Sequence, residues 1–147
     1  MSKLKTSKIL VAVDGSEESI KAANLALDLA KTYTSQLIAL AVSYIPLSIK
    51  VSSTDRLQKW HESNIKEARE WLTDIIHLSE ESKILFKLEV VETTSSVVRT
   101  IVEYAEKEDV RLIVVGTTGR SGFSRALLGS VASGVAAHAK CTVVIVR

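Results

Sequence analysis

The stretch that decides the fold is Arg111-Leu112-Ile113-Val114-Val115-Gly116-Thr117-Thr118-Gly119-Arg120-Ser121-Gly122, an apolar run that ends abruptly in a glycine-rich segment. Residues 112–115 show no polar alternation, as expected for a strand that is covered on both faces in a parallel sheet. Five of the six glycines in the chain fall between 116 and 134. A buried strand that opens into such a loop predicts an α/β protein with a ligand-binding loop at the end of a strand.

Other short segments repeat this pattern along the chain. Apolar, β-branched runs predict further strands at residues 8–13, 36–42, 84–90 and 142–146, and the run at 84–90 alternates enough to lie near a sheet edge. Amphipathic stretches predict helices at 16–33, 56–79, 96–107 and 130–140. The alternation of strands and helices predicts one doubly wound domain, a five-stranded parallel sheet with right-handed crossovers and helices on both faces.

Two details of the helical pattern concern the site. The first helix begins at Ser16, a capping residue that is followed by two glutamates. Trp60 and Trp71 fall on the apolar stripe of the predicted helix 56–79, which favours core packing over a ligand cage. Residues 44–54, which include the sole proline, predict a long irregular loop of the kind that gates a site.

Composition limits the function. A chain of 147 residues with 46% hydrophobic and 24% charged residues fits one globular domain. The net charge of +2 does not favour nucleic acid or an anionic membrane as a partner. The apolar run at residues 9–13 is too short for a signal sequence or a membrane span, so we expect a cytoplasmic protein. The single cysteine, Cys141, is expected to be a small buried hydrophobe.

Ligands of open α/β sheets lie beyond the carboxyl ends of the strands, where two segments attract attention. Asp14-Gly15-Ser16 follows the first predicted strand, and residues 116–130 follow the fourth. Glycines permit positive φ and let backbone N–H groups approach an anion. The start of the last helix, at Gly129-Ser130, adds unpaired N–H groups and a positive dipole end, with Arg120 or Arg125 beside them.

The alternative is that these glycines only make turns and that Ser130 only caps a helix. We favour the turn interpretation for Gly122 and Gly134. The remaining loop positions form the pattern G-x2-G-x9-G-[ST], with Gly116, Gly119, Gly129 and Ser130 at its fixed places. These four predict a phosphate-binding loop.

The loop residues, with Leu127-Leu128-Gly129-Ser130-Val131-Ala132, resemble the universal stress protein family. The first strand with Asp14-Gly15-Ser16 and the closing segment 141–147 resemble the same family, so the likeness covers residues 1–147. The resemblance implies a five-stranded parallel sheet ordered 3-2-1-4-5, of the adenine nucleotide alpha hydrolase-like fold. It also implies a homodimer paired through the last strand, residues 142–146.

The resemblance further implies ATP, alone or with Mg²⁺, as the ligand. Asp14 would accept hydrogen bonds from the ribose hydroxyls, or cap the first helix, or do both. The remaining positions implied beside the nucleotide fall into two groups: Ala12, Val13, Ala41 and Val42 near the base and sugar, and Val115, Gly116, Thr118, Gly119, Arg120, Gly129, Ser130 and Val131 near the phosphates.

Catalytic motifs are missing from the sequence. It contains no G-x4-GK[ST] loop, no Cys/His metal cluster and no G-x-S-x-G elbow, so we assign no catalytic and no metal-binding residue. The histidines at 61, 77 and 138 are expected at the surface or at helix ends, without evident partners.

Three functions remain at this stage. The favoured one is a homodimeric stress-response or signalling module that binds ATP, with at most weak ATPase activity. The second is a slow ATP hydrolase or autophosphorylating enzyme that uses the hydroxyls of Thr117, Thr118, Ser121 or Ser124. The third is a dimeric interaction protein that binds AMP, cyclic AMP or no nucleotide.

Overall fold

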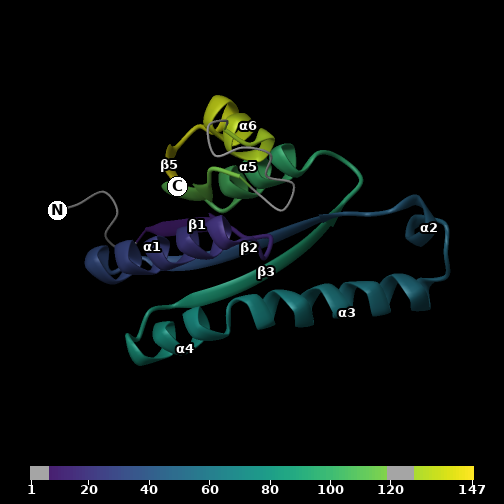
Figure 1. The fold of residues 1–147 in the computed structure, drawn as a ribbon, viewed down its shortest axis with the longest axis horizontal. Coiled ribbons are helices and arrows are strands. Elements are labelled where there is room, and N and C mark those ends of the chain that lie inside the picture. Colours follow the sequence, from purple (N-terminus) through teal and green to yellow (C-terminus); the bar gives the residue numbers. More distant parts are fainter. Residues whose placement is uncertain (1–6, 119–127) are drawn as a thin grey trace.

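The computed structural model describes residues 7–118 and 128–147. Within these residues five parallel strands form one sheet in the order β3-β2-β1-β4-β5 (Figure 1), which confirms the predicted sheet and its order. The strands are β1 (Lys8–Ala12), β2 (Gln36–Tyr44), β3 (Phe86–Thr93), β4 (Leu112–Gly116) and β5 (Thr142–Val146).

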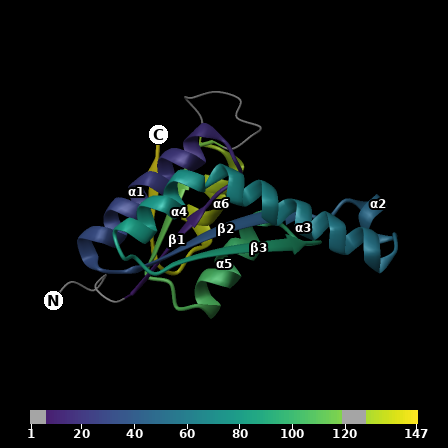
Figure 2. The ribbon, with the colours of Figure 1, turned by 90° about the horizontal axis from the view of Figure 1, so that it is seen from below.

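Helices cover both faces of the sheet, as predicted. One hydrophobic cluster joins the sheet to α1 (Glu17–Tyr33), α3 (Thr54–Trp71) and α4 (Thr73–Glu81). A second cluster joins the opposite face to α5 (Val97–Lys107) and α6 (Ser130–His138). Figure 2 shows α1, α3 and α4 on one side of the strands and α5 on the other. No described helix is long and apolar enough to cross a membrane.

The strand β1 is the buried centre of this arrangement. Its residues Ile9, Leu10 and Val11 have no exposed surface, and the strand is bonded to β2 on one side and to β4 on the other. The strand β3 lies at a sheet edge, where its side chains are partly exposed. The more alternating sequence of β3 therefore marks an edge, as expected, whereas the continuous apolar sequence of β5 does not reveal that β5 is the other edge strand.

The single helix predicted at residues 56–79 is wrong, because the chain forms α3 and α4 with a break at Leu72 (φ −106°, ψ 13°). The hydroxyl of Thr73 donates to the carbonyls of Arg69 and Glu70, at 3.2 and 3.1 Å, and so competes with the regular helical bonds. The side chain of Leu72 is fully buried. The break therefore lets α3 lie along β3 while α4 contacts α1.

The irregular loop predicted at residues 44–54 contains a short helix, α2 (Leu47–Lys50), which begins after Pro46. Beyond the end of β1, the strand β2 continues to Tyr44 and pairs only with β3. The two strands thus form a ribbon that carries α2 away from α5 and α6 (Figure 1). A role of this segment as a gate stays a prediction.

The burial of β1 can be tested by comparing one substitution in this strand with one at an exposed position. Leu10→Ala removes a fully buried side chain from β1, and we expect it to lower the free energy of unfolding by about 2–5 kcal/mol. Leu85→Ala, at a position that is 69% exposed, should change it by about 0.5 kcal/mol or less. Urea unfolding measures both values, and equal losses would contradict the assignment of Leu10 to the core.

Candidate functional site

The sheet register brings the ends of three strands together. Ala12 of β1 pairs with Leu40 of β2, and Val11 of β1 pairs with Val114 of β4. The backbone N–H of Val13 continues this pattern by donating to the Leu40 carbonyl at 3.0 Å. The residues just after β1 therefore lie at the carboxyl ends of the strands, near Ala41 of β2 and Gly116 of β4.

The chain leaves β1 through a hydrogen-bonded turn at Asp14, Gly15 and Ser16. Oδ1 of Asp14 accepts from the backbone N–H of Ser16 at 2.9 Å and from its hydroxyl at 2.5 Å. Oγ of Ser16 accepts from the Ser19 N–H and caps α1, as predicted for Ser16. The alternative role of Asp14 as the helix cap is wrong, because Asp14 instead holds the capping serine in place.

The first turn of α1 also packs closely against the end of β4. A Cβ atom on Gly116 would lie 2.8 Å from the carbonyl carbon of Glu18 and 2.9 Å from its oxygen. Glycine at this position thus permits the two segments to approach. Among the described glycines, positive φ occurs at Gly15 (φ +85°), so Gly116 and Gly129 serve close backbone approach rather than an unusual backbone conformation.

The segment after β4 meets the start of α6 at Thr117. The Thr117 carbonyl accepts from the N–H of Gly129 at 2.6 Å, and the Thr117 N–H donates to the Val146 carbonyl at 2.8 Å. A Cβ atom on Gly129 would lie 2.8 Å from the Thr117 oxygen, so this contact requires glycine. The predicted site residues Gly119 and Arg120 lie outside the described residues, as do Gly122 and Arg125.

The helix α6 begins without a side-chain cap. Gly129 is the capping residue (φ −62°, ψ 160°), and Ser130 is the first helical residue, so the alternative role of Ser130 as the cap is wrong. The backbone N–H of Ser133 is the first that bonds back, to the Gly129 carbonyl at 2.9 Å. The N–H groups of Ser130 and Val131 precede this bond, at the positive end of the helix dipole.

The other predicted site residues differ in burial. Three have buried side chains and support the edge from within the core, namely Val13, Ala41 and Val115. Three are partly exposed, namely Ala12, Val42 and Thr118. The described residues of both predicted segments thus lie at the carboxyl ends of the strands, while the side chains of Val13, Ala41 and Val115 lie in the core.

Packing explains Thr117 and Gly134, for which the sequence suggested a phosphate acceptor and a turn. The side chain of Thr117 is buried, with 7% of its surface exposed, which disfavours its hydroxyl as a phosphate acceptor. Ser121 and Ser124 lie outside the described residues. Gly134 lies inside α6, where a Cβ atom would come within 2.7 Å of Val98 on α5, so the predicted turn at Gly134 is wrong.

The expectation that the histidines have no partners is also wrong. Nδ1 of His61 on α3 contacts Oε1 of Glu92 on β3, and the same oxygen accepts from the side-chain amide of Asn64 at 3.4 Å. Nδ1 of His138 lies 2.9 Å from the Gly134 carbonyl, and His77 lies 4.0 Å from Glu81. Across residues 7–118 and 128–147, no group of three His, Cys, Asp or Glu side chains could hold a metal ion.

Helical periodicity missed that Trp71 lies against the turn after β1. The residue packs against the first hydrophobic cluster, as predicted for a core residue, but its indole also reaches Gly15. Periodicity could not reveal this contact, because it reports which face of a helix is apolar and not what that face meets. The Asp-Gly-Ser sequence after the strand was the available signal for a tight turn there.

A hollow of about 800 Å³ lies at the opposite end of the sheet, between the last residues of α5 and α6. Its lining includes Cys141 and an ion pair between Lys140 and Glu106 at 3.6 Å. Burial raises the pKa of the Cys141 thiol, which reduces its thiolate fraction and its reactivity at neutral pH. Cys141 is partly buried and packs against the second cluster, in keeping with a structural role.

Comparison with known proteins assigns the family. The model of the universal stress protein family matches residues 5–147. The chain belongs to the universal stress protein family. Universal stress protein MJ0531 of Methanocaldococcus jannaschii is 34% identical over 140 residues, which cover 95% of this chain and 81% of that protein. The family resemblance seen in the sequence is thereby confirmed.

Solved structures of universal stress proteins share the fold. UspA from Lactobacillus plantarum matches with a TM-score of 0.80 and 26% identity, covering 97% of this chain and 99% of that one. An Archaeoglobus fulgidus protein in complex with dAMP matches at TM-score 0.64 and 19% identity, covering 98% and 99%. An Arabidopsis thaliana family protein with AMP bound matches at TM-score 0.64 and 16% identity, covering 95% and 90%.

The close approach at Gly116 can be tested by adding one methyl group. Gly116→Ala places a Cβ against the backbone of Glu18, which cannot yield as a flexible side chain would. We expect the free energy of unfolding in urea to fall by about 1–3 kcal/mol. An unchanged unfolding midpoint would show that β4 and α1 are not in close contact at this point.

Proposed function

We propose that this universal stress protein binds adenine nucleotides at the carboxyl ends of β1 and β4, with ATP as the principal ligand. The observation that carries the proposal is the junction of the uncapped start of α6 with the end of β4, beside the Asp14 turn. Open N–H groups suit phosphate, and a carboxylate suits the ribose hydroxyls. The carboxyl ends of β1 and β4 would thus offer complementary groups for the phosphates and for the ribose.

The phosphate end needs more than the helix dipole. The dipole contributes about 0.3–1 kcal/mol at the surface and about 2 kcal/mol when partly buried, which is too little to hold ATP. We therefore assign the backbone N–H groups of Ser130 and Val131 to the phosphates, with Gly116 and Gly129 allowing the close backbone approaches that shape this end of the site. Thr118 and the predicted residues Gly119 and Arg120 complete this group in the proposal.

The base and sugar would lie toward β2. Asp14 would accept from the ribose hydroxyls, while the partly exposed Ala12 and Val42 would border the adenine. The buried Val13 and Ala41 would support this surface from below. Because the described residues hold no metal-ligand cluster, Mg²⁺ would be bound chiefly by the phosphates, as is usual for this ion.

The AMP and dAMP found in the two structural relatives support this class of ligand. The hydroxyl of Thr117 is buried and unsuited to accept a phosphoryl group, which disfavours autophosphorylation at this residue. We therefore propose a cytoplasmic module that signals stress by its nucleotide state, without rapid hydrolysis.

The first test is to identify the ligand directly. Mass spectrometry of the supernatant from purified, denatured protein should reveal an adenine nucleotide. Incubation of the native protein with ATP should then release little phosphate. Steady phosphate release that is lost in Asp14→Ala would instead establish the ATP hydrolase, and a protein whose melting temperature responds to no nucleotide would contradict the binding proposal.

The role of Asp14 can be tested against a matched residue. Asp14→Ala removes a charged acceptor and the bonds to Ser16, and we expect ATP affinity to fall about 10- to 100-fold. Asp28→Ala removes an exposed aspartate from the helix that follows the turn and should leave the affinity unchanged. Isothermal titration calorimetry compares the two, and equal affinities would contradict the placement of ribose at Asp14.

The partner surface is proposed to be β5. This strand is at the edge of the sheet, and its residues Val143 to Val146 are apolar and only partly buried. An edge of this composition favours pairing with another strand, and pairing with a second copy gives a closed dimer. We therefore propose a homodimer joined through residues 142–146.

Sedimentation equilibrium tests the dimer and its location. The protein should show twice the chain mass, and Ile145→Lys on β5 should shift it toward the monomer because a charge opposes burial at the interface. Leu88→Lys, at a partly buried position on the opposite edge strand β3, serves as the control and should leave the dimer intact. A monomer at every concentration would contradict the proposal.

A further inference from the structure

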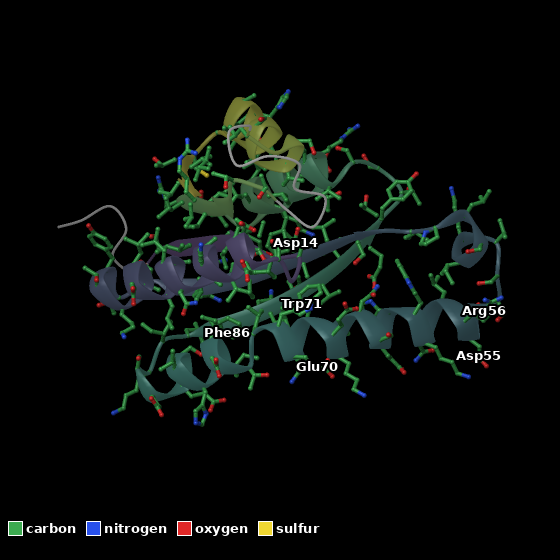
Figure 3. The ribbon with its side chains drawn as sticks, viewed as in Figure 1. Asp14, Asp55, Arg56, Glu70, Trp71 and Phe86 are labelled. Atoms are coloured by element: carbon green, nitrogen blue, oxygen red, sulfur yellow. The ribbon has the colours of Figure 1, made fainter. Side chains whose placement is uncertain are left out.

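Trp71 occupies a special place on α3. The residue ends that helix, directly before the break at Leu72. Its neighbours Ala68 and Leu72 are fully buried, so the helix end is firmly anchored against the sheet. Figure 3 shows Trp71 on the side of α3 that faces the sheet and Asp14, whereas Glu70 points away. The helix break thus places an aromatic side chain beneath the turn that follows β1.

The indole fits against Gly15 with little space to spare. A Cβ atom on Gly15 would lie 2.6 Å from Cε2, 2.7 Å from Nε1 and 3.0 Å from Cζ2 of Trp71. Gly15 also adopts φ +85°, a conformation that other residues rarely take. Since glycine can populate many backbone conformations, a contact that limits it has a large effect on the order of the turn.

The turn that the indole touches is the one that carries Asp14. Hydrogen bonds to Ser16 and Ser19 fix it from the side of α1, and the ladder bond of Val13 fixes it from the side of β2. These bonds lie on either side of the central residue, Gly15, and Trp71 packs directly against that residue.

We propose that Trp71 is a positioning residue of the nucleotide site, which holds the Asp14 turn in its binding conformation through the contact with Gly15. The inference rests on the proposed nucleotide binding and adds a determinant of affinity to it. Trp71 need not touch the ligand, because a turn that is already ordered does not lose conformational entropy on binding. The same contact makes Trp71 an intrinsic probe, since ligand at Asp14 alters the surroundings of the indole.

If Trp71 only stabilised the core, its replacement would change stability but not nucleotide affinity. Trp71 packs against the first hydrophobic cluster, so any truncation lowers stability whether or not the residue positions the turn. Phenylalanine retains one aromatic ring for the core but lacks the indole edge of Nε1, Cε2 and Cζ2 that approaches Gly15. Trp71→Phe should therefore separate the two roles, with a small change in melting temperature and a clear change in affinity.

The experiment uses three variants of the full chain. Calorimetric titration with ATP and with AMP should give weaker binding by about 10-fold for Trp71→Ala and by about 3-fold or more for Trp71→Phe. Trp60→Phe, on the same helix, is the matched control and should bind like the unaltered chain. Circular dichroism confirms that each variant is folded at the titration temperature, and Trp71→Phe carries the test if Trp71→Ala does not fold.

Fluorescence provides the second readout, because the chain has two tryptophans. In Trp60→Phe the remaining emission comes from Trp71 and should change on saturation with ATP, while the Trp60 emission of Trp71→Phe should not. Unchanged affinity in Trp71→Phe, or a Trp71 emission that ignores ATP, would overturn this inference. If the unaltered chain binds and Asp14→Ala weakens binding, the proposed function survives that result, whereas an unaltered chain that binds no nucleotide overturns both.

Discussion

The candidate site depends on the pairing of β1 with β2 on one side and β4 on the other. The strand order reverses at β1, because β2 and β3 follow on one side of it and β4 and β5 on the other. The helices that follow them, α1 after β1 and α6 after β4, pack on opposite faces, which is the arrangement at which open α/β sheets bind ligands. Asp14 and Gly116 are distant in sequence and become neighbours only through this pairing.

The strands could be predicted because short, continuous apolar runs rich in β-branched residues are typical of strands buried on both faces, while their order came from the family resemblance. The break between α3 and α4 could not. Ala68, Leu72 and Ile75 are all buried, so the helical spacing of apolar residues continues through the break. Periodicity records which side chains face the core, and that face is preserved when the backbone turns at Leu72.

The glycines show a second limit of sequence reasoning. Their spacing correctly placed a helix start at Gly129-Ser130, but not the reason for each described glycine. Gly15 provides the positive φ, Gly116 and Gly129 permit backbone contacts, and Gly134 lets α6 approach Val98. Close approach depends on what another segment places opposite the residue, which is a property of the folded chain.

The two halves of the site are held differently, and this difference bears on ligand choice. The Asp14 turn is hydrogen-bonded to the start of α1 and packed against Trp71. The start of α6 instead offers N–H groups without a side-chain cap, because its capping residue is Gly129. In the proposed site, a fixed acceptor at Asp14 would select for what all adenine nucleotides share near the sugar. Open donors tolerate different numbers of phosphates, because each further phosphate can use another N–H group. In the proposed site, the described residues would thus recognise the nucleoside through Asp14 and offer the N–H groups of Ser130 and Val131 to the phosphates.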